Sequence, residues 1–328
     1  MFKQLKLATI AAVVVAASGL ANAAEFKPAI VFDMGGKFDK SFNEAAFNGA
    51  EEFKKETGID YMEFEVTQVS QREQAMKRMA KKGASIIIAM GFAQASAVEK
   101  AAKANPGTKF TIIDMVVDLP NVQSIVFKEQ EGSFLVGMAA ALTSKTGKVG
   151  FIGGMDIPLI RKFALGYEEG AKYAKPGTVV FQNMTGTTPS AWNDPTKGGE
   201  LAKSQFDRGA DVVFAAAGGT GIGVYQAAKD SGKFAIGVDS NQNYMHPGTM
   251  LTSMTKRVDV AVKNAFATAK AGTWKAGIKV LGLKEHGVGY AVDQYNKDIL
   301  SADIIAKLEK ARADIISGKL KVTDYMAK

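Results

Sequence analysis

At 328 residues, the chain is long enough for two domains of ordinary size, each with its own hydrophobic core. Its composition, 47% hydrophobic and 23% charged residues, is that of a soluble globular protein, and the absence of cysteine excludes disulfides, thiolate nucleophiles and cysteine-bound metals. The formal net charge is +8, but the basic residues form no stripe beside a recognised reading element, so we expect no nucleic-acid partner.

The first residues have the pattern of a secretory signal peptide. Lys3 and Lys6 form a basic start, residues 7–20 are an apolar run, and residues 21–23 read Ala-Asn-Ala, a small-x-small cleavage site. The run is short for a membrane span, although an uncleaved anchor is the alternative. We predict cleavage near Ala23 and export to the periplasm. With no cysteine to carry a lipid, we expect the protein not to be a lipoprotein.

Strands and helices are predicted to alternate along the rest of the chain. Residues 29–33 are an apolar run next to glycines, typical of a buried parallel strand, and a helix over residues 45–53 follows, capped by Asp39 or Ser41. The next predicted elements continue this alternation: a strand over 61–66, a helix over 71–82, a strand near 124–127, a helix over 131–143, a strand over 148–154, a helix over 159–173, a strand over 178–184 and a helix starting at Asp194.

Two stretches look like copies of one another. Residues 83–114 and residues 209–239 each read as helix end, buried strand, loop, helix and buried strand, and each closes on an aspartate. A duplicated parallel unit predicts an α/β protein with two doubly wound parallel-sheet lobes that face each other across a cleft.

The chain is predicted to cross back to the first lobe after its second sheet. Residues 249–255 cross back, a helix covers 258–271, a strand pair covers 281–292 and a helix covers 301–317. We therefore assign residues 24–127 and 253–280 to the first lobe and residues 128–252 and 281–328 to the second. The alternative is that the C-terminal helices return to the first lobe.

Candidate binding residues stand at the ends of predicted strands. Ligands of open parallel sheets bind outside the carboxyl ends of the strands, where Asp33, Asp114 and Asp239 fall. Each aspartate also fits a role as a turn cap. Three carboxylates at one cleft would accept hydrogen bonds from ligand N–H and O–H groups and would repel phosphate, which favours a neutral or cationic ligand.

Two aromatic residues accompany these carboxylates. Phe42 begins a helix after the Asp33 loop, and Trp192 precedes the helix start at Asp194, so rings from opposite lobes would sandwich a flat heterocycle. Phe42 equally fits core packing.

A glycine-rich loop and a lysine complete the candidate set. The run Gly218-Gly-Thr-Gly-Ile-Gly223 matches no nucleotide-binding fingerprint, so we interpret Gly218 and Gly219 as a loop of close backbone approach to a ligand. Lys256 is placed to reach a ligand hydroxyl or an aspartate, and a surface role is the alternative.

Catalytic signals are weak. The two histidines, His246 and His286, form neither a triad nor a metal-spaced cluster. We predict a protein that is not an enzyme and that uses no metal and no cofactor.

Several blocks together resemble the basic membrane protein family, the purine nucleoside receptor-like substrate-binding proteins. The resemblance rests on Asp-Lys-Ser-Phe-Asn at 39–43 after the strand that ends in Asp33, and it continues in four later blocks, which begin at Gly132, Lys148, Asn193 and Gly237. The sequence departs from the family pattern in having tryptophan at 192, where phenylalanine is common, and in lacking a lipid-carrying cysteine.

The resemblance implies a type I periplasmic-binding fold with a multi-strand hinge and a monomer that delivers purine nucleosides to an ABC permease in the inner membrane. It implies stacking on Phe42 and Trp192 beside Asn43, base contacts from Asp33 and Asp114, and ribose contacts from Asp239, Lys256 and a glycine at 218 or 219. Alternatives are a sugar or flavin-like ligand, an exported nucleoside hydrolase, or a ligand-sensing regulator core, which the signal peptide argues against.

Overall fold

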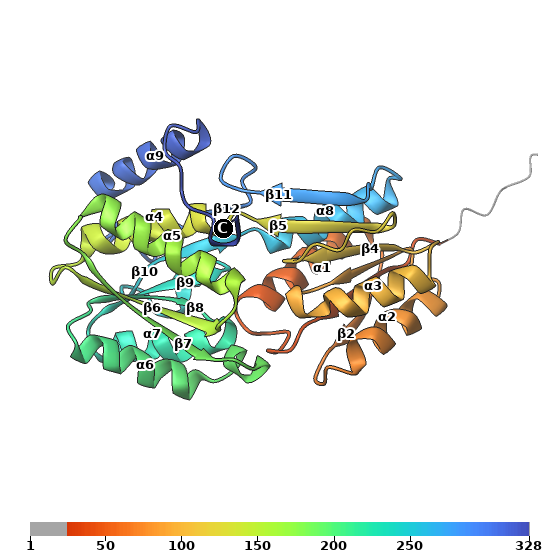
Figure 1. The fold of residues 1–328 in the computed structure, drawn as a ribbon, viewed down its shortest axis with the longest axis horizontal. Coiled ribbons are helices and arrows are strands. Elements are labelled where there is room, and N and C mark those ends of the chain that lie inside the picture. The colour runs from red at the N-terminus through yellow and green to blue at the C-terminus, as the bar shows by residue number, and fades with distance from the viewer. Residues whose placement is uncertain (1–24, 328) are drawn as a thin grey trace, which may run out of the picture.

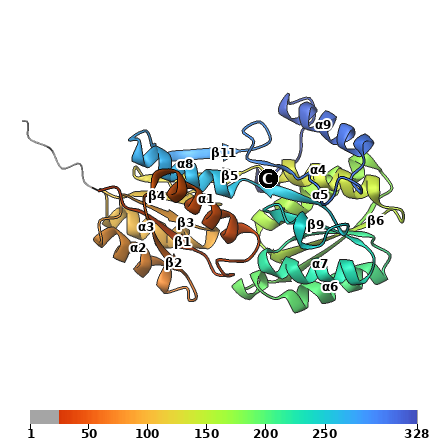
Figure 2. The ribbon, with the colours of Figure 1, turned by 180° about the vertical axis from the view of Figure 1, so that it is seen from behind.

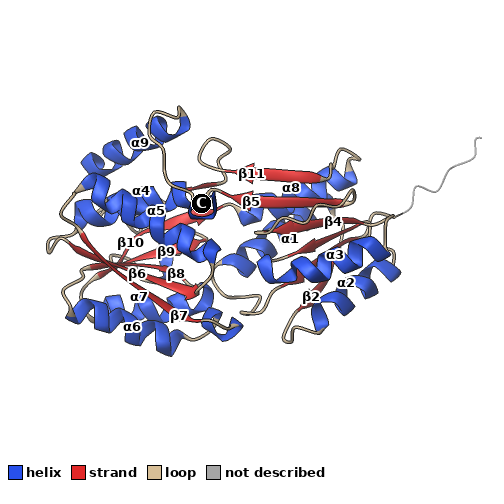
Figure 3. Cartoon of the chain, viewed as in Figure 1, coloured by secondary structure: helices blue, strands red, loops and turns tan. Residues whose placement is uncertain are grey.

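The computed structural model describes residues 25–327 and arranges them as two lobes side by side (Figure 1). Each lobe is a six-stranded sheet with helices on both faces (Figure 3). This arrangement confirms the predicted pair of doubly wound α/β lobes. The predicted signal peptide lies outside the described residues.

The first lobe is built on a wholly parallel sheet in the order β11-β5-β4-β3-β1-β2. Its strands are β1 (Pro28–Phe32), β2 (Met62–Glu65), β3 (Ile86–Ala89), β4 (Lys109–Ile113), β5 (Val122–Phe127) and β11 (Gly277–Leu281). The helices α1 (Phe42–Thr57) and α8 (Val258–Lys270) pack together on one face, and α2 (Gln71–Lys81) and α3 (Ala95–Ala104) on the other. Because both faces are covered, successive residues of β1 are buried in opposite cores.

The second lobe repeats this topology in the order β12-β10-β9-β8-β6-β7. Its strands are β6 (Lys148–Met155), β7 (Val179–Gly186), β8 (Val212–Ala216), β9 (Phe234–Asp239), β10 (Met250–Lys256) and the antiparallel β12 (Val288–Tyr290). The helices α4 (Glu129–Thr143) and α5 (Pro158–Ala174) cover one face, and α6 (Pro195–Asp207) and α7 (Gly221–Asp230) the other, with α9 (Ala302–Ile316) against α4. Short 3-10 turns are η1 (Phe92–Gln94), η2 (Pro189–Trp192), η3 (Gly218–Thr220), η4 (Asn243–Met245) and η5 (Tyr325–Ala327).

Three chain crossings join the lobes, after β5, after β10 and after β11. Seen from the front and from behind, β5, β11 and α8 run along the same side of the molecule (Figures 1 and 2). A single hydrophobic core continues through this region and includes side chains of both sheets.

The crossings differ from the predicted lobe boundaries. The strand β10 stays paired with β9 up to Asp239 opposite Thr255, so the chain leaves the second lobe after Lys256 rather than at residue 253. The predicted strand pair over 281–292 is wrong, because β11 joins the first sheet and β12 the second. The strand β12 pairs over only three residues, too few to give a readable alternation.

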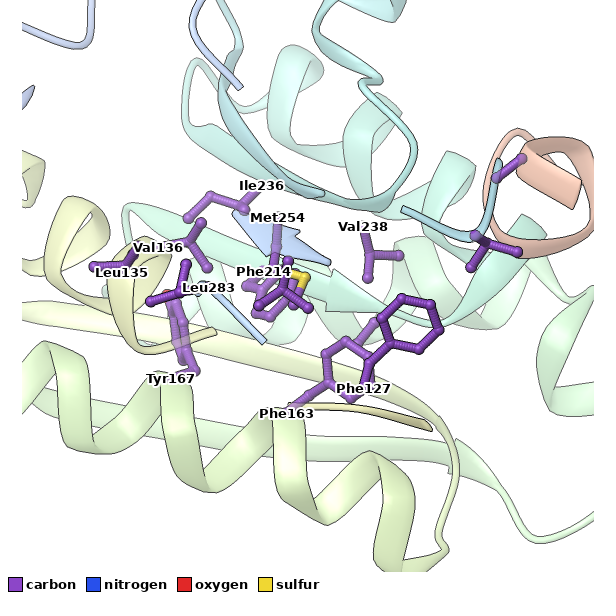
Figure 4. Packing of buried hydrophobic residues seen from close by; sticks show 14 of the residues in the cluster. Phe127, Leu135, Val136, Phe163, Tyr167, Phe214, Ile236, Val238, Met254 and Leu283 are labelled. Atoms are coloured by element: carbon purple, nitrogen blue, oxygen red, sulfur yellow. The ribbon is translucent and has the colours of Figure 1, made fainter. Parts of the chain in front are cut away.

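The core of the second lobe depends on close contact between α4 and α5. Figure 4 shows part of this core, with Phe127 and Phe163 at one end and Leu135 and Val136 at the other. The helix backbones approach at three glycines, because a Cβ added at Gly137, Gly166 or Gly170 would overlap a carbonyl oxygen of the opposite helix.

We therefore expect Gly170→Ala to destabilise the protein by about 1–3 kcal/mol, the usual cost of overpacking, despite the better helix propensity of alanine. The measurement is the midpoint of denaturant unfolding. Gly177→Ala is the matched control, since a Cβ there has no atom within 4 Å. An equal change in both variants would show that the helices do not need this close approach.

Candidate functional site

A cavity lies between the lobes, at the carboxyl ends of the central strands of both sheets. It holds about 610 Å³ of space free of protein atoms, part of it continuous with solvent, which is within the range of small-molecule sites, about 300–1,000 Å³. Eight of the nine predicted binding residues line it: Asp33, Phe42, Asn43, Asp114, Trp192, Gly218, Asp239 and Lys256. Gly219 is the exception, since it lies outside the cavity lining.

The three predicted aspartates occupy related places. Asp33 follows β1, Asp114 follows β4, and Asp239 ends β9. The last two have left-handed backbone conformations, with φ of 71° and 63°, which aspartate tolerates better than most residues. Burial raises the pKa of all three carboxyl groups, against neighbouring cations that lower it. The cavity therefore has a wall rich in carboxylates, as the sequence predicted.

The motif at residues 39–43 builds the start of α1. The Asp39 carboxylate accepts hydrogen bonds from the backbone N–H groups of Ser41, Asn43 and Glu44 at 2.8–3.1 Å, so Asp39 rather than Ser41 caps the helix. Burial raises the pKa of Asp39 to about 7, although these hydrogen bonds lower it. The side chain of Asn43 contacts both the backbone of Asp33 and the Asp39 carboxylate, which ties the helix start to the end of β1.

The same motif also joins the lobes. The Ser41 hydroxyl donates to Asp239 Oδ2 at 2.5 Å, the Ser240 hydroxyl donates to the Ser41 carbonyl at 3.1 Å, and the Gln242 amide donates to the Lys40 carbonyl at 2.8 Å. Lys40 has a positive φ of 61°, which shapes this turn. These three contacts, called here the interlobe latch, show that the two lobes are closed on each other.

Lys256 is the cation of the site and is 2% exposed. Its ammonium lies 2.6 Å from Asp114 Oδ2 of the first lobe and 3.1 Å from Glu129 Oε1 of α4. It also lies 5.0–5.7 Å from the ring centres of Phe42, Phe127 and Phe163, a cation–π distance. Burial alone would lower the pKa of Lys256, but the carboxylates of Asp114, Glu129 and Asp239 raise it above its ordinary value, so this side chain stays charged.

The two predicted stacking residues reach the cavity from opposite lobes. Phe42 begins α1 and is half-buried, and Trp192 ends η2 and is half-buried. The indole of Trp192 lies over Gly154, where any added Cβ would collide with the ring. Its Cβ lies 3.3 Å from the position of a Cβ on Gly35, so Trp192 also touches the first lobe. The absence of a side chain at Gly154 leaves room for the indole ring.

Several site residues were not predicted from the sequence. Glu129 forms an ion pair with Lys256, and Arg72 forms one with Asp33. Phe92 and Phe163 line the cavity. Glu129 is an acidic residue in the first turn of a helix, and Arg72 lies on an amphipathic helix, so both fit an exposed position equally well by pattern. The two histidines lie outside the cavity lining, and no cluster of metal-binding type occurs within residues 25–327.

A closed two-lobed α/β protein with a cavity at the strand ends is a ligand-binding protein of the periplasmic-binding fold. The chain belongs to the family described as PnrA-like ABC transporter substrate-binding proteins, whose profile matches residues 26–325. The predicted membership is thereby confirmed, and the protein is the substrate-binding component of an ABC transporter, with a small-molecule ligand and a permease partner.

Two relatives and one solved structure illustrate the match. The ABC transporter nucleoside-binding protein BmpA of Lactococcus lactis is 34% identical over 91% of this chain and 89% of its own. An uncharacterized lipoprotein of Pyrococcus horikoshii is 38% identical over 80% of this chain and 68% of its own. The crystal structure of an ABC transporter solute-binding protein from Aeropyrum pernix has a TM-score of 0.83 at 29% identity and covers 92% of this chain and 94% of that one.

The relatives contradict the predicted localisation as a free periplasmic protein that is not a lipoprotein. Three of them, from Pyrococcus abyssi, Pyrococcus horikoshii and Pyrococcus furiosus, are named lipoproteins at 37–38% identity. We therefore withdraw that prediction. The chain contains no cysteine, and the N-terminal residues on which the prediction rested lie outside the described part. Within the described part, no helix is long and apolar enough to cross a membrane.

The interlobe latch gives a prediction for the unliganded protein. A hydrogen bond to a charged group contributes about 1.5–3 kcal/mol, so we expect Ser41→Ala to lower the ratio of closed to open molecules about tenfold or more. Spin labels on Lys103→Cys and Lys203→Cys, one exposed position on each lobe of a chain without native cysteine, would report the distance distribution.

The control is Ser317→Ala, because the Ser317 hydroxyl bonds only within its own lobe, to the Asp314 carbonyl, among the described contacts. A distance distribution that is the same for both variants would show that the Ser41–Asp239 contact does not hold the lobes together.

Proposed function

We propose that the protein binds a purine nucleoside or the free purine base between its lobes and hands it to the permease. The observation that carries this proposal is the meeting of Phe42 and Trp192, from opposite lobes, in a cavity that also contains three buried carboxylates. A flat heterocycle with N–H donors and a hydroxylated sugar matches both features. The Lactococcus lactis relative named a nucleoside-binding protein supports the same ligand class.

The base is assigned to the side of the cavity formed by Asp33 and Asp114. Asp114 uses Oδ2 for Lys256, while its buried Oδ1 has no hydrogen-bond partner among the described residues. A buried acceptor without a partner is costly, and a ligand N–H would satisfy it. The two carboxylates therefore favour bases with N–H donors, such as guanine, over bases that present mainly acceptors.

The sugar is assigned to Asp239, Lys256 and Gly218. Gly218 has a positive φ of 57° and no side chain, so its backbone approaches the cavity directly. We assign this backbone contact to Gly218 rather than Gly219, which lies outside the cavity lining. A phosphate at the sugar end would meet the carboxylates of Asp39 and Asp239, so nucleosides are preferred to nucleotides.

A thermal-shift panel tests the proposal. A ligand at 100 times its Kd stabilises the folded state by about 2.7 kcal/mol, which raises Tm measurably. We expect shifts with guanosine, inosine, adenosine and the matching bases, and little with ribose, D-glucose, riboflavin or GMP. A Tm shift with only a sugar or only riboflavin would show that the ligand belongs to that class and is not a purine. Release of free base from a nucleoside would show that the protein is a hydrolase.

The stacking role has its own prediction. Each ring contact is worth about 1–3 kcal/mol, so Phe42→Ala and Trp192→Ala should each weaken guanosine binding about tenfold or more in calorimetric titration. Phe38→Ala is the matched control, because Phe38 is 58% exposed, close in sequence to Phe42, and outside the cavity lining. A variant that keeps wild-type affinity removes its ring from the binding site.

The sugar role is tested by comparing nucleoside with base. Asp239→Ala should weaken guanosine more than guanine, because only the nucleoside carries the hydroxyls. The control is Ser41→Ala, which removes the hydroxyl that Asp239 accepts across the lobes and should weaken both compounds alike. Equal losses for guanosine and guanine in Asp239→Ala would assign this carboxylate to closure alone.

A further inference from the structure

Arg72 is a buried cation that does not touch the cavity. It lies on α2, behind the first sheet's cavity edge, and only 7% of its surface is exposed. Its Nη2 lies 2.9 Å from Asp33 Oδ1, and both side chains are nearly excluded from solvent. The Arg72 Nε is buried without a hydrogen-bond partner among the described residues, so the Asp33 carboxylate, bonded through Nη2, is the one hydrogen-bond partner of this side chain there.

Two further neighbours, Asn43 and Gly91, surround Asp33. Its backbone N–H donates to Asn43 Oδ1 at 3.2 Å, which links it to the start of α1. Its Oδ2 lies beside Gly91, and a Cβ on that glycine would come within 2.7 Å of the oxygen. Gly91 also has a φ of 93°, which side chains disfavour. The carboxylate thus has one oxygen on Arg72 and the other in a space kept open by a glycine.

The charge on Asp33 depends on Arg72 because the other nearby cations are paired with other carboxylates. The other charged groups of the cavity lining are Asp39, Asp114, Asp239 and Lys256, and the following loop, β2 and α1 carry Lys37, Glu65 and Glu44. Lys37 is paired with Glu63, and Lys256 with Asp114 and Glu129. Burial raises the pKa of Asp33, and Arg72 is the only side chain that opposes this increase appreciably.

We propose that Arg72 is the positioning residue of the binding site, which keeps the Asp33 carboxylate ionised and aimed at an N–H donor of the ligand. The identity of the ligand donor in this inference rests on the proposed function, whereas the ionisation state of Asp33 does not. An arginine suits this place because its guanidinium stays charged even when buried. A helix outside the cavity thereby determines how well a carboxylate inside it accepts a hydrogen bond.

The experiment compares Arg72→Met, which removes the charge at similar length, with the wild type, using guanosine as the probe from pH 5.5 to 9. Without Arg72, the pKa of Asp33 rises, so the carboxyl is protonated over a wider pH range and becomes the stronger, charged acceptor only at higher pH. We expect guanosine binding at least tenfold weaker at pH 6 in Arg72→Met, with most of the loss recovered by pH 8, where guanosine still carries its N1–H donor. In the wild type, the fall in affinity should begin at lower pH.

A ligand-free measurement separates this inference from the ligand assignment. Carbon-13 NMR of aspartate-labelled protein, with the Asp33 signal identified by its loss in Asp33→Asn, should show the titration of Asp33 displaced to higher pH in Arg72→Met. Arg72→Lys should restore both the titration and the affinity in large part. If the wild type fails to bind guanosine, the proposed ligand is wrong, and the NMR titration alone decides the role of Arg72.

Two results would overturn the role of Arg72. One is an unchanged Asp33 titration in Arg72→Met, and the other is an affinity loss of the same size at every pH, which is the signature of a structural defect. The Asp33→Asn background gives the last control, because adding Arg72→Met to it should leave the remaining pH dependence of the affinity unchanged. If Arg72→Met does not fold, the same comparison is made with Arg72→Gln and Arg72→Lys.

Discussion

The ammonium group of Lys256 holds the functional centre of the molecule together. It stands at the point where the chain leaves the second lobe, with Asp114 of the first lobe on one side and Glu129 on the other. Glu129 in turn lies 3.0 Å from Lys162 of α5, so opposite charges alternate from the cavity into the second lobe. A buried charge whose partner is removed is strongly unfavourable, so none of these residues is independent of the others. The aromatic rings around Lys256 exclude water and keep the local dielectric low.

This placement makes the hinge and the binding site one structure. Glu129 follows the first crossing, Lys256 precedes the second, and Asp114 lies at the cavity edge of the first sheet. Any rotation of the lobes about the crossings changes distances within the charge cluster, and the interlobe latch joins the lobes at a second place, between residues 40–41 and residues 239–242. Closure is thus held at two places, one by ion pairs and one by three hydrogen bonds, of which one goes to the Asp239 carboxylate and two go to backbone carbonyls. A ligand bound between them shifts the balance only through contacts that exist in the closed arrangement.

The fold was largely predictable because its signals are local. Apolar runs next to glycines marked the parallel strands, and the copied stretch at residues 83–114 and 209–239 predicted two lobes of one topology. The lobe boundary at residue 253 was wrong because β10 continues to Lys256 in the second sheet, and no local signal distinguishes a long strand from a crossing. The strand pair over 281–292 was wrong for a related reason, since the choice of sheet depends on what lies beside each strand in space.

The site was predictable only in part. Residues at strand ends were found because chain position alone brings them to one edge, as with Asp33, Asp114 and Asp239. Arg72 and Glu129 were not found, because each lies on a helix whose pattern gives no sign that a charged residue turns inward. Their burial follows from the carboxylate or ammonium they meet there. Sequence patterns therefore fail to predict buried charged residues that contact a site residue without being identified by their position at a strand end.

The two copies of the duplicated stretch, residues 83–114 and 209–239, share unusual backbone conformations as well as a strand order. Gly91 and Gly218 both have positive φ after equivalent strands, and so do Asp114 and Asp239 at the ends of the next strands. An aspartate held in a left-handed conformation at the same place in both copies indicates that the repeat fixes a turn as well as a sheet. The copies then diverge in what their carboxylates meet, since Asp114 pairs with a cation and Asp239 with a hydroxyl of the opposite lobe. Symmetry of the backbone places two equivalent carboxylates in one cavity, whereas their partners differ: Asp114 keeps a buried oxygen without a hydrogen-bond partner among the described residues, and Asp239 gives one oxygen to the contact that joins the lobes.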